Sequence, residues 1–164
     1  MNAKTLINPS TPAAAILTTG LFAGLLDGLA ACVQAYLARE TSPVIVFQYI
    51  ASAVLGPDSF KGGLPTALLG LLFHLTIATS WTALFFFAYP RVALFRKNWI
   101  GSGIGFGIFV WVMMNRVIVP MTKIPSRPFV LQNAVIGILI LMVAIGTPIS
   151  FLARRFYARS NSSA

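Results

Sequence analysis

The sequence predicts an all-α integral membrane protein, a four-helix transmembrane bundle with one short additional helix, forming a single domain over residues 1–164. Of the 164 residues, 57% are hydrophobic and only 9% are charged, a composition that a soluble domain with a polar surface can hardly have. Four apolar runs reach the roughly 20 residues that a membrane-spanning helix needs. These runs are continuous instead of alternating with period two, which favours helices over the strands of a barrel.

The four spans are expected in chain order, with Thr11 as N-cap of the first and Pro12 at its first helical position. A further apolar segment, 43–55, is too short to cross a bilayer and is closed by Gly56 and Pro57. Such a length is typical of a re-entrant or interfacial helix at one end of a bundle. The expected spans are 12–37, 64–88, 99–121 and 129–153.

The basic residues indicate lipid headgroups and a membrane topology. A net charge of +9 would suggest nucleic acid in a soluble protein, but here the cations lie at the ends of apolar runs, so no nucleic-acid partner is expected. Four spans place both termini on one side, and seven of the twelve Lys and Arg residues fall on that side, which predicts cytoplasmic termini. These seven are Lys4, Arg91, Arg96, Lys97, Arg154, Arg155 and Arg159, and the other five are Arg39, Lys61, Arg116, Lys123 and Arg127.

A carboxylate near the middle of the first span is the most unusual feature of the chain. Asp27 would cost about 2.5–3.5 kcal/mol on insertion scales, so it requires a partner, a water-filled cavity or a function. At a rise of 1.5 Å per residue, Asp27 and His74 of the second span both lie roughly 3–5 Å from the midplane on the same side. The two side chains are therefore expected to face each other.

Further polar residues lie outward on that side and predict a polar pocket open to the non-cytoplasmic face. Gln34 shares a helix face with Asp27, and Asn115 and Arg116 follow on the third span. Asp27 would form the floor with His74 beside it, Arg116 would lie near the mouth, and the segment 43–55 would act as a lid. A purely structural interpretation stays open, in which Asp27 is locked to Arg116 or a Trp N–H, His74 and Asn115 bond neighbouring helices, and Arg116 reaches the headgroups.

Glycines at four-residue spacing predict two faces for close helix packing. Gly20, Gly24 and Gly28 lie on the first span, and Gly101 and Gly105, interleaved with two more glycines, lie on the third. Small residues at this interval let another helix approach closely, whether that helix is internal or belongs to another chain.

The inventory of reactive residues predicts no metal site, no cofactor and no enzymatic activity. Cys32 is the only cysteine and His74 the only histidine, so neither a zinc site nor bis-histidine haem ligation is expected. The chain also has no HExxH, CxxC or phosphate-binding loop.

Several segments resemble those of uncharacterised four-helix bacterial inner-membrane proteins of the YagU-like kind. The resemblance implies a multi-pass protein of the bacterial plasma membrane with no assigned reaction. Related sequences tend to have an additional histidine on the last helix, where this chain is apolar from Ile138 to Val143. The segments are AGLLDGLAA from Ala23, GLLFHLTIATSW from Gly70, GFGIFVWVMMNRVIVP from Gly105 and IGTPIS from Ile145.

Two functions compete at this stage. The first is a non-catalytic structural or accessory subunit that packs through its glycine faces against other membrane protein chains or a second copy of itself. The alternative is a small transporter or proton-coupled channel that uses Asp27 and His74. In both cases the lipid bilayer is the surrounding partner.

Overall fold

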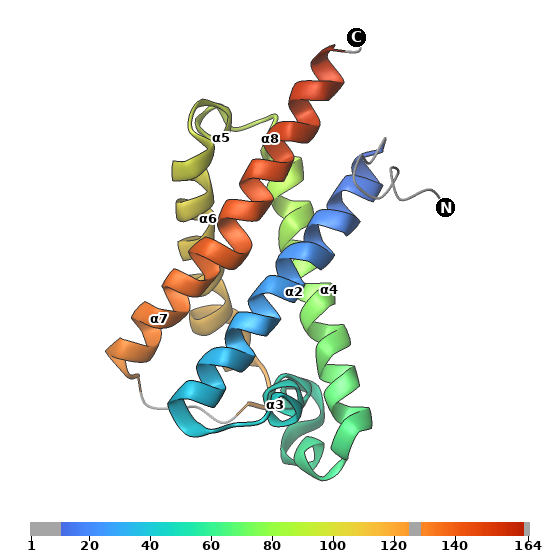
Figure 1. The fold of residues 1–164 in the computed structure, drawn as a ribbon, viewed down its shortest axis with the longest axis vertical. Helices are drawn as coiled ribbons and strands as arrows, with labels where there is room; N and C mark the ends of the chain where they lie inside the picture. The colour runs from blue at the N-terminus through green and yellow to red at the C-terminus, as the bar shows by residue number, and fades with distance from the viewer. Residues whose placement is uncertain (1–10, 125–128, 163–164) are drawn as a thin grey trace.

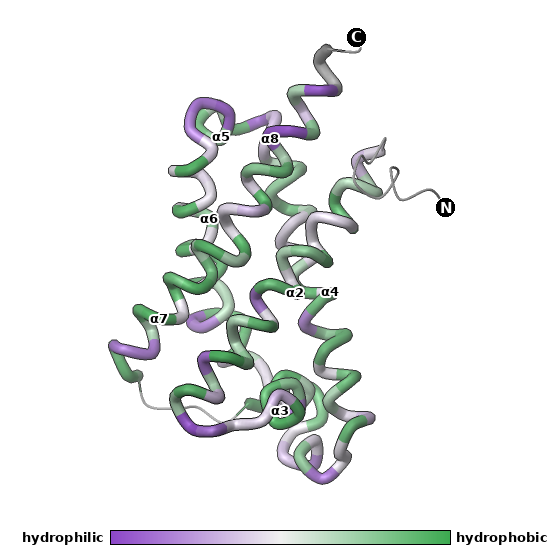
Figure 2. Tube along the Cα trace, in the orientation of Figure 1, coloured by the Kyte–Doolittle hydropathy of each residue, from purple (hydrophilic) through white to green (hydrophobic). Residues whose placement is uncertain are grey.

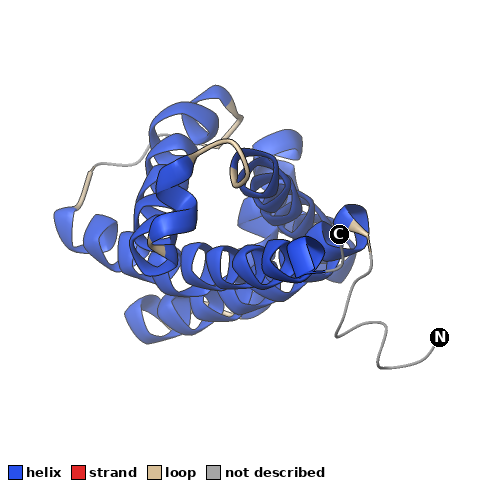
Figure 3. Cartoon of the chain, turned by 90° about the horizontal axis from the view of Figure 1, so that it is seen from above, coloured by secondary structure: helices blue, strands red, loops and turns tan. Residues whose placement is uncertain are grey.

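The computed structural model describes residues 11–124 and 129–162, which form helices joined by short loops with no strand in either range (Figure 3). The predicted helical class is confirmed, as are four helices long and apolar enough to cross a membrane. Lys4 and Arg127, which entered the charge comparison, lie outside the described residues. The four helices are Pro12–Arg39, Gly63–Ala88, Trp99–Met121 and Leu131–Arg159.

The bundle consists of two helix pairs. In the first pair, α2 (Pro12–Arg39) packs along α4 (Gly63–Ala88). In the second, α6 (Trp99–Met113) packs against a long last helix, and α2 runs beside that helix and contacts its middle part (Figure 1). The last helix runs well past its predicted end at residue 153 and consists of α7 (Leu131–Leu141), the π-helical turn η4 (Met142–Gly146) and α8 (Thr147–Ser162).

The short helix α3 (Pro43–Leu55) has the predicted bounds and lies across one end of the bundle. It is seen nearly end-on in Figure 1, where the long helices stand upright. It packs chiefly against α4, and the 3-10 turn η1 (Gly56–Lys61) leads from it into that helix. The start of α2, the end of α8 and the short helix α5 (Ala93–Lys97) lie at the opposite end.

The start of α2 follows its predicted signals. Thr11 is the N-cap, and its side chain accepts a hydrogen bond from the backbone N–H of Ala14 at 3.3 Å. Pro12 follows at the first helical position, where its missing N–H has no intrahelical partner to lose. At the other end, Glu40 adopts the left-handed conformation that terminates the helix.

Two π-helical turns share one cause. In η2 (Met114–Ile118) the N–H of the next residue, Val119, donates to the carbonyl of Met114, and Pro120 follows. In η4 the N–H of Thr147 donates to the carbonyl of Met142, and Pro148 follows. Because proline has no N–H for the carbonyl four residues before it, each helix widens by one residue just ahead of a proline. From η2 the third span continues into the 3-10 turn η3 (Val119–Met121).

The two predicted glycine faces are used differently. On α2, a Cβ at Gly20 would come within 2.7 Å of the Thr79 Cα, and Gly24 and Gly28 face the same helix, so this face packs inside the chain. On α6, by contrast, Gly101 and Gly105 are exposed, and a Cβ at Gly105 would meet nothing within 4 Å. The inward face of α6 is formed by the other phase, Gly103 and Gly107, which pack against Gly146 and Met142 of the last helix.

Packing differs between the two halves of the bundle. We call the half that contains the termini and α5 the terminus-side half, and the half capped by α3 the α3-side half. The large buried side chains Phe85, Phe86 and Ile149 belong to the terminus-side half. In the α3-side half the buried residues are small or polar: Gln48, Ala51, Ser52, Gly56, Ser59, Ala67, Gly70 and Ala134.

Candidate functional site

The glycine face of α2 brings two ionisable side chains together in the middle of the first helix pair. Because Gly24 and Gly28 have no side chains, α4 approaches closely enough for His74 to reach the backbone of α2. The Nε2 atom of His74 lies 2.9 Å from the carbonyl oxygen of Gly24. A carbonyl only accepts hydrogen bonds, so this contact requires a proton on Nε2.

Asp27 is the second partner of the same nitrogen. Its Oδ2 atom lies 3.7 Å from His74 Nε2, and the side chains are 16% and 14% exposed, respectively. Sequence depth alone predicted that the two would face each other, and the structure places them in contact range. Both interrupt apolar helices at mid-height, where short hydrophilic stretches appear on α2 and α4 (Figure 2). The arrangement is a carboxylate beside an imidazole, two groups that can each take up a proton.

The transverse helix α3 covers this pair from the bundle end. The Phe47 ring lies edge-on to the His74 ring, with 6.2 Å between their centroids. Gly70 allows the approach, because a Cβ there would overlap the carbonyl oxygen of Phe47. The buried Gln48 side chain donates to the carbonyl of Gly63 at 3.0 Å and fixes α3 on the start of α4. Gln48, expected as part of a lid, therefore acts as an internal link.

Gln34 belongs to a different feature, a groove of about 690 Å³ between α2 and α7. The groove ends at Ala30, which is one helical turn from Asp27, so the two polar features adjoin along α2. The described residues that line it are Ala30, Val33, Gln34, Leu37, Ala38, Arg39, Gln132, Asn133, Ile136 and Ile140.

Asn115 and Arg116 lie on the surface of the π-helical turn η2. The Asn115 amide donates to the carbonyl of Trp111 in its own helix at 3.0 Å. The Arg116 guanidinium lies 4.7 Å from the centre of the Phe129 ring. Both are exposed, and neither is among the described residues that line the groove. Of the five predicted pocket residues, the structure thus joins Asp27 with His74, places Gln34 beside them, and sets these two apart.

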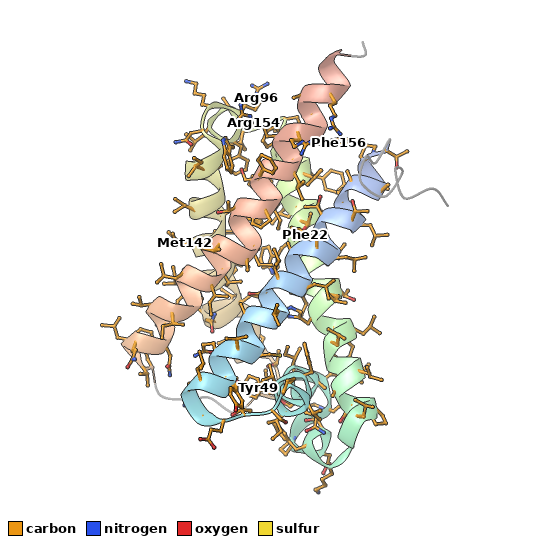
Figure 4. The ribbon with its side chains drawn as sticks, viewed as in Figure 1. Phe22, Tyr49, Arg96, Met142, Arg154 and Phe156 are labelled. Atoms are coloured by element: carbon orange, nitrogen blue, oxygen red, sulfur yellow. The ribbon has the colours of Figure 1, made fainter. Side chains whose placement is uncertain are left out.

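The terminus-side end combines stacked aromatic rings with cations. Tyr89, which follows α4, stacks on Tyr157 with 5.2 Å between ring centroids, and Tyr157 donates to the carbonyl of Phe86. Burial raises the pKa of Tyr89, while the positive charges of Arg154 and Arg96 oppose the shift. Figure 4 shows these two arginines at the same end of the molecule. Sequence reasoning missed this ring cluster.

Comparisons of this chain with family models, curated proteins and solved structures found no match. The described residues contain no group of three His, Cys, Asp or Glu side chains that could hold a metal ion. The geometry within the chain is therefore the basis for any functional conclusion.

Proposed function

We propose that this protein is a multi-pass membrane protein that exchanges protons at the Asp27–His74 pair and couples this exchange to transport. Insertion into lipid is supported by the large apolar side chains that the long helices turn outward, since soluble monomers rarely expose contiguous apolar surface on this scale. They include Leu17, Phe22, Leu25, Leu29, Leu68, Leu72, Phe87, Leu139 and Val143.

The distribution of charge supports an orientation with cytoplasmic termini in a bacterial plasma membrane. Among the described residues, six Lys and Arg side chains lie at the terminus-side end and four at the α3-side end. The two acidic residues outside the spans, Glu40 and Asp58, both lie at the α3-side end. An excess of cations marks the cytoplasmic side of spans that are joined by short loops.

The observation that carries the proposal is the 3.7 Å contact between Asp27 and His74 inside two apolar helices. With His74 neutral and Asp27 ionised, the pair has a net charge of −1. A proton added to the imidazole produces an ion pair with no net charge, and its release restores the negative charge. Because a net charge in lipid is costly, loss of the proton favours uptake of a compensating ligand or cation, which is the coupling that a carrier needs.

Few other titratable groups are close enough to replace this pair. Of the elements that pack around this part of α2 and α4, α7 and η4 contain no titratable side chain, and α3 contains only Tyr49. The described cations of α8 begin at Arg154, which lies at the terminus-side end of the molecule (Figure 4). Asp27 and His74 therefore dominate the proton chemistry of the bundle centre.

Proton exchange can be tested in proteoliposomes that contain a trapped pH indicator. After a drop in external pH, we expect the wild-type protein to accelerate acidification of the vesicle interior. Asp27→Asn should abolish this acceleration. The isosteric amide keeps the shape of the side chain but cannot ionise. Asp58→Asn is the matched control, because this exposed carboxylate pairs with Lys61 at 2.8 Å outside the spans. Proton exchange by Asp27→Asn at the wild-type rate would refute the proposal. Equal misfolding of Asp27→Asn and Asp27→Ala would assign Asp27 a structural role.

An accessory-subunit function is the second candidate, supported by the outward glycines Gly101 and Gly105 on α6. The remaining glycines of the two predicted faces are used inside the chain, which reduces the surface available for a partner helix. Purification in native lipid followed by mass measurement separates the candidates. A stoichiometric larger partner would support the accessory function, and a monomer or homodimer would count against it.

A further inference from the structure

The groove between α2 and α7 has the length of one bilayer leaflet. Along α2 it extends from Ala30 to Arg39, a rise of about 13 Å at 1.5 Å per residue. The hydrocarbon core of a bilayer is about 30 Å thick, so one leaflet contributes about half of that. Arg39 is the last residue of α2, and Gln132 lies in the first turn of α7, so both mark the same end of the groove.

The chemistry of the groove changes along its length. Toward the middle of the molecule it is mostly apolar, with Ala30 and Val33 on α2 and Ile136 and Ile140 on α7, and Gln34 is the one polar side chain there. At the helix ends polar groups join Leu37 and Ala38: Arg39 is the only charged side chain among the described lining residues, and Gln132 and Asn133 lie opposite. Water would find few partners along the apolar part. The gradient matches an aliphatic chain whose anionic head lies at the level of the headgroups.

We infer that this groove binds one acyl chain of an anionic phospholipid from the leaflet on the α3 side, with the lipid phosphate held by Arg39. A guanidinium binds phosphate through paired charge-assisted hydrogen bonds, and the neighbouring amides of Gln132 and Asn133 supply further donors. A volume of about 690 Å³ is in the range of ligand sites that bury most of a small molecule. The inference goes beyond proton exchange, because it assigns a lipid site that needs neither Asp27 nor His74.

Native mass spectrometry of the full chain from nanodiscs tests the site. With equal amounts of phosphatidylglycerol and phosphatidylcholine, we expect the wild-type protein to retain one phosphatidylglycerol preferentially. Arg39→Gln should reduce that preference about tenfold, since the positive charge that favours a headgroup of net negative charge is lost together with its charge-assisted hydrogen bonds. Lys61→Gln is the charge control, because Lys61 lies at the same end of the bundle but is paired with Asp58. Equal retention of the two lipids by wild type would overturn the inference.

The apolar part of the site is tested by filling it. Ile136→Trp should occupy the groove and prevent retention, whereas Val135→Trp, on the exposed neighbouring residue, should have no effect. Glycerol phosphate, the head without a chain, should not displace the bound lipid. Retention of the lipid by Ile136→Trp, or its displacement by glycerol phosphate, would contradict a chain-binding groove. If Ile136→Trp fails to fold, a photoactivatable phosphatidylglycerol on the wild-type protein decides, because its crosslinks must concentrate on groove residues instead of spreading over exposed leucines.

Discussion

The two halves of the bundle are built by different means. In the terminus-side half, large aromatic side chains fill the space between helices: Phe85 is fully buried, stacks on Phe95 and meets Phe106 edge-on, at centroid distances of 4.9 and 4.8 Å. In the α3-side half the buried residues are small or polar, and α2 and α7 separate far enough to form a groove. The terminus-side half holds the helices together through its core, and the α3-side half has space for polar groups between its helices.

This difference places the ionisable pair at the boundary. Interlocking large side chains resist rearrangement, because moving one ring opens a void that its neighbours cannot fill. When helices shift, contacts between small residues lose less packing energy than contacts between large ones. Membrane transport requires such shifts. Asp27 and His74 lie where α2 and α4 pass from the first kind of packing to the second. The arrangement supports a carrier that moves its α3-side half against a fixed terminus-side half.

The largest expected effect comes from Phe85→Ala. Removing a fully buried ring that touches two other rings should destabilise the protein by about 3–5 kcal/mol, through lost contacts and the resulting cavity. Denaturant unfolding in mild detergent measures the loss. The matched control is Phe87→Ala on the same helix, whose side chain is 61% exposed and should cost far less. Equal losses for the two variants would mean that the terminus-side half is not held by its core.

Gly70→Ala should have a smaller effect, confined to the α3-side half. Its Cβ would overlap the carbonyl oxygen of Phe47, so α3 must move, and overpacking of this kind costs about 1–3 kcal/mol. Amide hydrogen exchange should speed up in α3 and the start of α4 and stay unchanged in α8. Gly105→Ala is the control, because a Cβ there meets open space. Faster exchange throughout the chain would show that the two halves are not separate units.

The sequence predicted the fold well because the constraints of a bilayer are simple. Span length and the end of each apolar run located the four long helices, and Gly56 and Pro57 closed α3 at the observed residue. The shared depth of Asp27 and His74 was also predictable, since depth follows from position along a helix. These features depend on one helix at a time.

Features that depend on the relation between helices could not be predicted. Gly101, Gly103, Gly105 and Gly107 contain two phases with the same four-residue spacing on opposite sides of α6, and only the position of Gly146 on the last helix selects the inward phase. The single pocket expected from Asp27 to Arg116 likewise assumed that all polar residues of one leaflet point to a shared interior. The observed faces of η2 and α7 depend on helix rotation and tilt, which apolar composition does not encode.

The smallest expected effect concerns pH. It tests whether the packing at the terminus-side end also shields the Tyr89 hydroxyl from water. Tyr89 is only 5% exposed, and burial raises its pKa above the value of about 10 for a free tyrosine, despite the opposing charges of Arg154 and Arg96. A raised pKa means that the neutral phenol favours the folded state, so this contribution is complete below about pH 10 and is lost as pH rises through the higher folded pKa. Tyr89→Phe should therefore match wild type in thermal stability at neutral pH and lose less stability at alkaline pH.

Tyr36→Phe, on an exposed residue of α2, should follow the wild-type alkaline curve. Identical alkaline curves for Tyr89→Phe and wild type would show that water reaches the Tyr89 hydroxyl. The tightly packed core of this half would then end before the level of Arg154 and Arg96.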